Sequence, residues 1–277
     1  MRKLSRMAKN APDTSSSIRK RRTGRRSPLA SVALIVVGLL STGGVYALFT
    51  TSAAAETTAV SEQLIDDGSK LFAANCATCH GLNLQGANGG PSLIGVGAAS
   101  VEFQVATGRM PLAQSGPQAQ KKASQFTTEQ IEALYTYVAA QAPGPGIPDA
   151  ELLTGEGDAS VGGELFRINC AMCHNVAGAG GALTEGKYAP SLSGVTPQHI
   201  YEAMLTGPQS MPVFNDTNIS PEDKANIITY LKYLDETPSA GGFDLGNLGP
   251  VSEGLFIWIF GLGGIVAITV WLTARSN

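Results

Sequence analysis

Two short motifs contain all four cysteines of the chain and two of its three histidines. They read C-A-T-C-H at residues 76–80 and C-A-M-C-H at residues 170–174. C-x-x-C-H is the attachment signature of c-type haem, because the two cysteines meet the two vinyl groups of one porphyrin and the histidine ligates the iron. The motifs therefore predict two covalent c-type haems, attached at Cys76, Cys79, Cys170 and Cys173, with the iron ligands His80 and His174.

Disulfides and a zinc site are the alternatives for four cysteines. An exported domain would permit disulfides, but such pairing does not require a histidine after each cysteine pair. A single zinc ion held by all four thiolates would have to bridge two halves of the chain. Two complete copies of a specific motif favour haem.

The two motifs belong to an internal repeat. Four landmarks recur in the same order, namely G-x-x-L-F-x-x-N-C-A-x-C-H (68–80 and 162–174), P-S-L (91–93 and 190–192), M-P (110–111 and 211–212) and T-Y (136–137 and 229–230). This order indicates the duplication of one small domain.

The sixth ligand of each iron follows from the methionines. The first repeat has a single histidine, and Met110 is its only methionine. In the second repeat, Met172 lies inside the motif, Met204 falls on a probable core helix, and Met211 occupies the position that matches Met110. We therefore predict Met110 and Met211 as axial ligands, with a packing role as the alternative for each. A filled iron has no open site for substrate, so the expected chemistry is one-electron transfer.

Several other side chains have two interpretations. An iron-bound histidine usually donates its second N–H to a carbonyl, and Pro91 and Pro190 are candidates to supply it, or else simple turn prolines. Arg109 and Arg167 either pair with haem propionates or are solvated charges. His199, the remaining histidine, is expected at the surface or in packing.

The segments around the motifs read as helices, and no alternating pattern of convincing length predicts a strand. Thr127 followed by Gln130 forms a capping-box pattern before an apolar stripe. Ser220 before Pro221 places an N-cap residue ahead of a proline at the first helical position. The expected fold class is all-α, with two tandem domains, each too small to build a generous apolar core unless a buried haem supplies its centre.

Two apolar runs, residues 30–49 and 251–273, are long enough to cross a membrane, since about twenty residues at ~1.5 Å each span the hydrocarbon layer. Ten Lys or Arg precede the first run, whereas residues 50–250 carry eight Lys or Arg against twenty Asp or Glu, a net charge of −12. We therefore expect a multi-pass plasma-membrane protein with cytoplasmic termini and exported haem domains. A signal peptide cleaved near Ala55 is the alternative for the first run.

Each repeat resembles a class I cytochrome c domain, with the attachment motif, P-S-L, M-P and a final amphipathic helix in that order. Two such domains between two apolar helices are similar to the dihaem cytochrome c subunit (cytochrome cc, QcrC-like) of the actinobacterial menaquinol–cytochrome c reductase, over essentially the whole chain. Neither haem domain contains the tryptophan that many single-haem relatives place against the ring.

The resemblance implies partners and a place in respiration. A cytochrome b subunit would oxidise menaquinol, and a Rieske iron–sulfur subunit would pass electrons to one haem. The other haem would reduce the copper centre of an aa3-type cytochrome c oxidase. The complex is a translocase that contributes to the proton-motive force, whereas this chain alone would be an electron carrier without a catalytic residue. No nucleic-acid partner is expected.

These features divide the chain into a basic cytoplasmic tail (1–29), a transmembrane helix (30–49), a linker (50–61), a first cytochrome c domain (62–142), a linker (143–160), a second cytochrome c domain (161–237), a Gly-rich linker (238–250), a transmembrane helix (251–273) and a cytoplasmic tail (274–277). Proline and glycine at 143–148 prevent a helix from continuing between the domains.

Two other functions fit a dihaem chain. A dihaem cytochrome c peroxidase would need one iron with an open or displaceable sixth position. An electron-acceptor subunit of another exported dehydrogenase would need different partners. Ligand spectra separate the first from the reductase subunit, and co-purifying proteins separate the second.

Overall fold

The computed structural model describes residues 28–237 and 250–275, with the backbone alone for residues 47–60, 250 and 251. The predicted basic tail, almost all of the Gly-rich linker and the last two residues lie outside the described residues. Two helical segments are long and apolar enough to cross a membrane, Pro28–Tyr46 with a mean hydropathy of 2.0 and Ser252–Arg275 with 2.3. They overlap the two apolar runs of the sequence.

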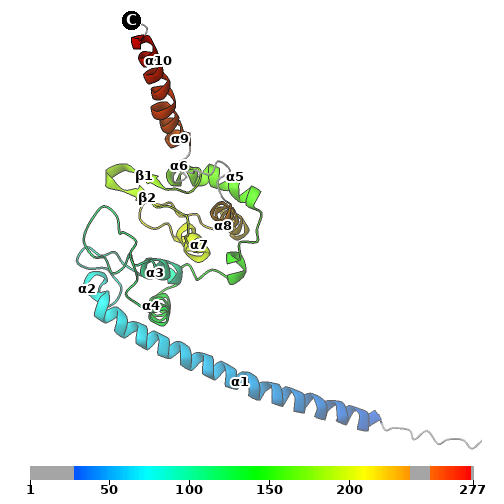
Figure 1. Ribbon diagram of the computed structural model, residues 1–277. Helices are drawn as coiled ribbons and strands as arrows, with labels where there is room; N and C mark the ends of the chain where they lie inside the picture. Colours follow the sequence, from blue (N-terminus) through cyan, green and yellow to red (C-terminus); the bar gives the residue numbers. More distant parts are fainter. Residues whose placement is uncertain (1–27, 238–249, 276–277) are drawn as a thin grey trace, which may run out of the picture. The chain divides into compact units, whose positions relative to one another are not determined.

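The first apolar segment is the beginning of a long helix, α1, which spans Pro28–Asn75 (Figure 1). Residues 50–61, which the sequence assigns to a linker, lie inside this helix. They contain neither glycine nor proline, and three consecutive alanines favour the helical state. The second apolar segment consists of α9 (Pro250–Phe256), a π-helical turn η4 (Ile257–Leu262) and α10 (Gly263–Arg275).

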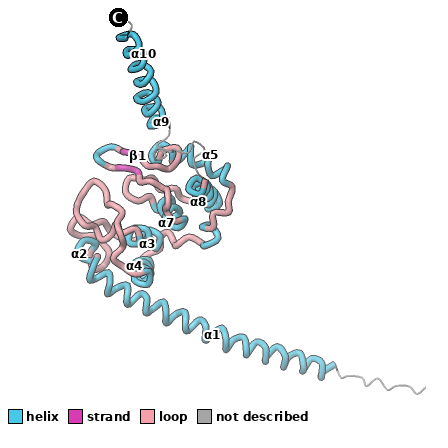
Figure 2. Tube along the Cα trace, in the orientation of Figure 1, coloured by secondary structure: helices cyan, strands magenta, loops and turns pink. Residues whose placement is uncertain are grey.

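The first repeat contains the end of α1 and three further helices, α2 (Ala77–His80), α3 (Gly97–Ala106) and α4 (Thr128–Gln141). The capping box predicted at the start of α4 is present, because the Thr127 side chain accepts from the Gln130 amide and the Gln130 side chain accepts from the Thr127 amide. Long loops join these short helices (Figure 2).

The second repeat follows the same plan with more elements. They are η1 (Ala150–Leu153), α5 (Ala159–Asn169), α6 (Ala171–His174), β1 (Gly181–Ala182), η2 (Thr184–Gly186), β2 (Tyr188–Ala189), α7 (Pro197–Thr206) and α8 (Pro221–Glu236). The Ser220 side chain caps α8 by accepting from the Asp223 amide, and Pro221 occupies the first turn, as the sequence predicts.

A close crossing of the first and last helices organises each repeat. A β-carbon at Gly68 would lie 2.0 Å from the carbonyl oxygen of Ala133, and one at Gly162 would lie 1.9 Å from that of Asn226. Only glycine allows the helix backbones to approach this closely. One turn further on, Phe72 packs on Tyr137 and Phe166 packs on Tyr230, each pair with ring centroids 5.5 Å apart.

The described residues are mainly helical, as predicted, but β1 and β2 form a short antiparallel pair that the prediction of an all-α fold does not include. Each of these strands has two residues, too few for an alternating pattern to be visible in the sequence. The pair forms a hairpin between the attachment motif and Pro190 of the second repeat.

Candidate functional site

Each attachment motif folds into a single helical turn. In α2 the amides of Cys79 and His80 both bond to the Cys76 carbonyl, at 3.1 and 3.0 Å. In α6 the amides of Cys173 and His174 bond in the same way to the Cys170 carbonyl, at 3.1 and 2.9 Å. The first cysteine of each motif is the N-cap residue of this turn, and the second cysteine and the histidine lie in its last two positions.

Both motif histidines are oriented by a proline carbonyl. His80 Nδ1 lies 2.8 Å from the carbonyl oxygen of Pro91, and His174 Nδ1 lies 3.0 Å from that of Pro190. A carbonyl only accepts, so Nδ1 carries the proton and Nε2 keeps a free lone pair. This arrangement fixes the ring orientation and is the one that metal-bound histidines use. Of the two interpretations of these prolines, the acceptor role is the one the geometry supports.

Burial adjusts the protonation of the motif side chains. Burial lowers the pKa of His174, although its bond to Pro190 opposes the change, so the imidazole is neutral and able to ligate a metal. Burial raises the pKa of Cys76 and of Cys170 to about 11, and the neighbouring cysteine adds to the effect. These two cysteines are therefore thiols, not thiolates, at neutral pH.

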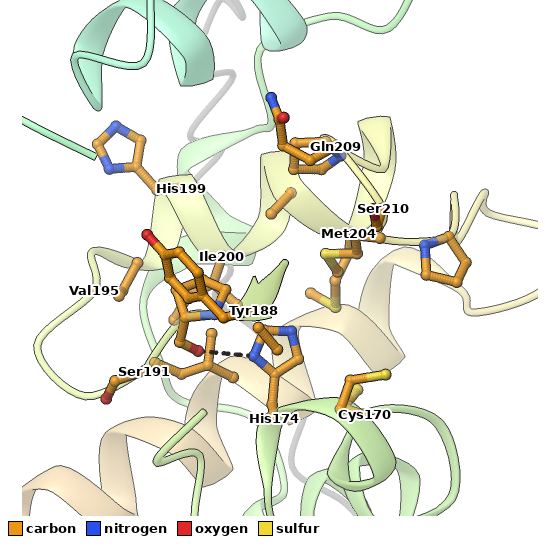
Figure 3. Close-up of a pocket in the computed structure, with 18 of the residues that line it drawn as sticks. Cys170, His174, Tyr188, Ser191, Val195, His199, Ile200, Met204, Gln209 and Ser210 are labelled. Carbon is orange, nitrogen blue, oxygen red and sulfur yellow. Dashed lines mark hydrogen bonds between the residues drawn. The ribbon is translucent and has the colours of Figure 1, made fainter. Parts of the chain in front are cut away.

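A largely apolar cavity opens beside the second motif (Figure 3). Cys170, Cys173 and His174 line it, and the sulfur-bearing side chains of Met204 and Met211 also contribute to its wall. Figure 3 shows the dashed bond that holds the imidazole ring of His174. Soft sulfur and imidazole donors around an apolar space fit a haem group.

The first domain supplies part of this cavity wall. Phe103, Thr107, Arg109, Gln118 and Lys121 all line the cavity beside the second motif. The contact is fixed by the loop before α4. Gln118 Nε2 donates to the Tyr188 carbonyl at 3.0 Å, and the Tyr188 amide donates to Gln118 Oε1 at 2.9 Å.

Arg109 is the charged member of that wall. It is 8% exposed, and its guanidinium carbon lies 4.8 Å from the centroid of the Phe103 ring. Burial lowers its pKa. No carboxylate of the described residues forms an ion pair with it. Arg167, the other arginine that the sequence offers for an anionic group, is exposed.

The candidate methionines differ in their surroundings. Met172 is 93% exposed on α6 and contributes to the cavity from the motif side. Met204 is 2% exposed and belongs to the apolar core of the second domain, while Met211 packs against that core. In the first domain Met110 and Cys76 pack against the same cluster, which is built around Phe72 and Leu134. The assignment of Met110 and Met211 as iron ligands remains a prediction.

A group of buried and partly buried polar side chains between the domains escapes sequence reasoning. Glu102 of α3 lies beside His199 and Glu202 of α7, and each offers a donor atom within 4.8 Å of the other two. The sequence assigns His199 only a surface or packing role. The spacing of His199 and Glu202 on one helical face is a weak signal, and nothing in the sequence shows which residue of the first repeat meets them.

Comparison with known proteins agrees with the geometry. Residues 65–142 match the family described as cytochrome c, and residues 157–231 match the family described as cytochrome c oxidase, cbb3-type, subunit III. The chain is 44% identical to the cytochrome bc1 complex cytochrome c subunit of Corynebacterium efficiens, covering 97% of this chain and 96% of the relative. It is equally similar to the proteins of the same name from Mycobacterium bovis, over 95% of this chain and 96% of the relative, and Mycobacterium leprae, over 88% and 87%.

Proposed function

Because the chain belongs to the family of cytochrome bc1 complex cytochrome c subunits, we propose that it carries electrons within a membrane-bound quinol–cytochrome c reductase. The similarity over nearly the full length of the chain and of its relatives is the observation that carries this proposal. Cytochrome c domains imply covalent c-type haem, and two such domains, each with its own attachment motif, support two haems per chain.

The proposed haem sites use equivalent residues in the two domains. Bound c-type haem supplies one-electron chemistry at its iron. Cys76 and Cys79 would hold the first group and Cys170 and Cys173 the second. The bonds from His80 and His174 to their proline carbonyls orient each imidazole before any metal binds. His80 and Met110 would hold the iron of the first group, and His174 and Met211 would hold that of the second.

Arg109 has a proposed role at the second site. A buried guanidinium without a carboxylate partner is costly, and a haem propionate would be its natural counter-ion. Arg109 belongs to the first domain and directly precedes Met110, yet it lines the cavity of the second domain. One short segment of chain would therefore contact both cofactor sites.

The partners and the membrane topology complete the proposal. A cytochrome b subunit and a Rieske iron–sulfur subunit would deliver electrons from quinol, and an aa3-type cytochrome c oxidase would receive them, so that the complex contributes to the proton-motive force. The two apolar helices would anchor the chain in the plasma membrane. The ten basic residues near the N-terminus favour cytoplasmic termini and haem domains on the outer face.

Native purification tests the proposal. The full-length chain should be purified from its own membranes in mild detergent, and its partners identified by mass spectrometry. We expect cytochrome b and Rieske subunits in fixed proportion to this chain, with quinol-dependent reduction of its c-type haem. A haem-loaded chain that copurifies with neither subunit, and that quinol does not reduce through the complex, would contradict it.

A further inference from the structure

Two carboxylates and one imidazole meet at the interface between the haem domains. Glu102 lies on α3 of the first domain, whereas His199 and Glu202 lie one turn apart on α7 of the second. The helices α3 and α7 pack against each other. One donor atom from each side chain lies within 4.8 Å of the corresponding atoms of the other two.

Glu202 is the most deeply placed member of this group. It is 0% exposed, and its Oε1 accepts from Gln198 Nε2 at 3.0 Å. Its other oxygen, Oε2, is buried and has no hydrogen-bond partner. The Oε2 atom of Glu102 is also buried without a hydrogen bond, and it lies 3.4 Å from His199 Nε2. Two buried carboxylate oxygens without a hydrogen bond therefore belong to a cluster that also offers an imidazole nitrogen.

Within the described residues, no lysine or arginine forms an ion pair with Glu102 or Glu202. Two carboxylates this close cannot both be ionised in a buried place without a cation. Burial, reinforced by the neighbouring Glu102, raises the pKa of Glu202 to about 10. Without a further cation, Glu202 therefore retains its proton at neutral pH, and Glu102 faces both this carboxyl group and the imidazole of His199.

We propose that Glu102, His199 and Glu202 bind one divalent cation of the zinc class and that this ion links the two haem domains. Zinc bonds to nitrogen and carboxylate oxygen are about 2.0–2.2 Å long, so tetrahedral ligand atoms lie about 3.3–3.5 Å apart. The 3.4 Å separation of Glu102 Oε2 and His199 Nε2 is such an edge. Three protein ligands leave the fourth position to water.

The charges balance when the ion is bound. A neutral imidazole and two carboxylates carry a charge of about −2, which a divalent ion cancels. The ion would take the place of the Glu202 proton, so that binding releases one proton. The imidazole favours zinc over magnesium or calcium, which prefer oxygen ligands alone. The competing explanation is a proton shared between the two carboxylates, with no metal at all.

A metal at this position would hold the cofactor sites at a fixed separation. The ion would tie α3 to α7. The chain leaving α3 continues through Arg109, which lines the cavity of the second domain, to Met110. On α7, Met204 lines the same cavity. The proposed zinc site needs only the contact between α3 and α7, so it does not depend on the proposed respiratory role.

Zinc binding to the intact protein tests the inference. The full-length chain with its natural partners should be treated with a chelator and dialysed against Zn²⁺ in small excess. Zinc is then counted per c-type haem by mass spectrometry, in the wild type and in Glu202→Gln. Glu164→Gln is the matched control, because it makes the same substitution at an exposed position on α5. X-ray absorption at the zinc edge identifies the ligands.

We expect the wild type and Glu164→Gln to hold one more zinc ion per chain than Glu202→Gln, with affinity reduced by on the order of 100-fold in the variant, since even outer-shell partners are worth about 10–100-fold. The absorption spectrum should show nitrogen and oxygen ligands only. Equal zinc in all three proteins would overturn the inference in favour of a shared proton. Zinc–sulfur bonds near 2.3 Å would also overturn it, because they place the metal on free cysteines.

Two further variants keep the test decisive if Glu202→Gln does not accumulate with haem. Glu102→Gln removes the ligand on the other domain, and His199→Gln removes the nitrogen ligand, and both side chains are only partly buried. Each should lose the same single ion while its haem spectrum stays intact. Retention of the ion in both would exclude the site.

Discussion

The two cytochrome c domains share their attachment turns and their helix crossing but differ in the loops between them. The first domain has 11 positions from its motif histidine to the proline that accepts its bond, and the second has 16. The added residues form the β1–β2 hairpin. Conversely, the segment from Met110 to α4 is longer than the segment from Met211 to α8. Each domain therefore carries one insertion that its copy lacks.

The two insertions meet. Gln118, from the long loop of the first domain, exchanges two hydrogen bonds with Tyr188 of the hairpin. The Ala119 amide donates to Gln209 Oε1 at 3.2 Å. The segments that the repeats do not share therefore add contacts to an interface that the packing of α3 against α7 also forms. Divergence after duplication has thus turned two similar domains into a specific pair.

The largest expected effect comes from the shared helix crossing. Gly162→Ala forces a methyl group against the Asn226 carbonyl of α8, and Gly68→Ala does the same to Ala133 of α4. Overpacking against backbone should cost about 3 kcal/mol or more. Each variant should lose haem from its own domain first, as measured by haem staining of proteolytic fragments. Ser160→Ala, at an exposed position of α5, is the control. If each variant loses haem equally from both domains, the two domains do not retain haem independently of each other, and the prediction is wrong.

The next effect separates the two methionines of the second cavity. Met211→Leu should lower the reduction potential of one haem, because His/Met ligation raises it. Met204→Leu conserves volume in the core and should cost less than about 1.5 kcal/mol with the ligation unchanged. Redox titration with absorption spectra measures both. A lowered reduction potential in Met204→Leu with an unchanged potential in Met211→Leu would identify Met204 as the ligand. The alignment of Met211 with Met110 would then be wrong.

A smaller effect is expected where the insertions meet. Gln118→Ala removes both partners of the Tyr188 backbone, which should cost about 1–2 kcal/mol at the interface. Hydrogen exchange at the Tyr188 amide should accelerate, while exchange within α5 and α8 stays slow. Gln120→Ala, an exposed neighbour on the same loop, should leave exchange unchanged. If the Tyr188 amide exchanges as slowly in Gln118→Ala as in the wild type, the loop contributes little to the contact between the domains.

A further effect is a pH dependence in the metal-free protein. The folded-state pKa of Glu202, raised to about 10 chiefly by burial, lies above its ordinary value of 4.5, so the folded chain keeps a proton that the unfolded chain releases. The stability that this proton contributes is complete below the ordinary pKa and is lost as the pH rises toward 10. Glu202→Gln should therefore gain melting temperature over the wild type between about pH 5 and pH 8.

Thermal unfolding after chelator treatment measures this difference, with Glu164→Gln as the control. If the difference in melting temperature between Glu202→Gln and the wild type does not change with pH, Glu202 is not a buried acid with a raised pKa. Added Zn²⁺ should abolish the pH dependence of the wild type by displacing the proton.

The sequence predicts what depends on local spacing. The attachment motifs, the caps of α4 and α8 and the apolar helices are all encoded within a few turns of chain. It leaves open the role of Pro91 and Pro190, because a proline carbonyl becomes an acceptor only once the loop is folded. It misses the hairpin, whose strands have two residues each, and it assigns a linker at 50–61 where α1 continues.

Contacts between the domains lie beyond such reasoning for a physical reason. Glu102, Arg109 and Gln118 are ordinary surface residues in the sequence of the first repeat. Glu102 meets α7 where α3 packs against it, and Gln118 lies on a loop that is longer in the first repeat, so the repeat pattern gives no register for pairing them with His199, Glu202 or Tyr188. Features within one repeat are predictable from its copy, whereas contacts between the repeats are not.

The central claim is that each domain carries its own covalent haem. Mass spectrometry of the denatured full-length chain tests it most directly, followed by the peptides that contain residues 76–80 and 170–174. The account predicts an intact mass above that of the polypeptide by two haem groups, with one haem on each peptide. A mass equal to that of the bare polypeptide, or haem on only one of the two peptides, would contradict it.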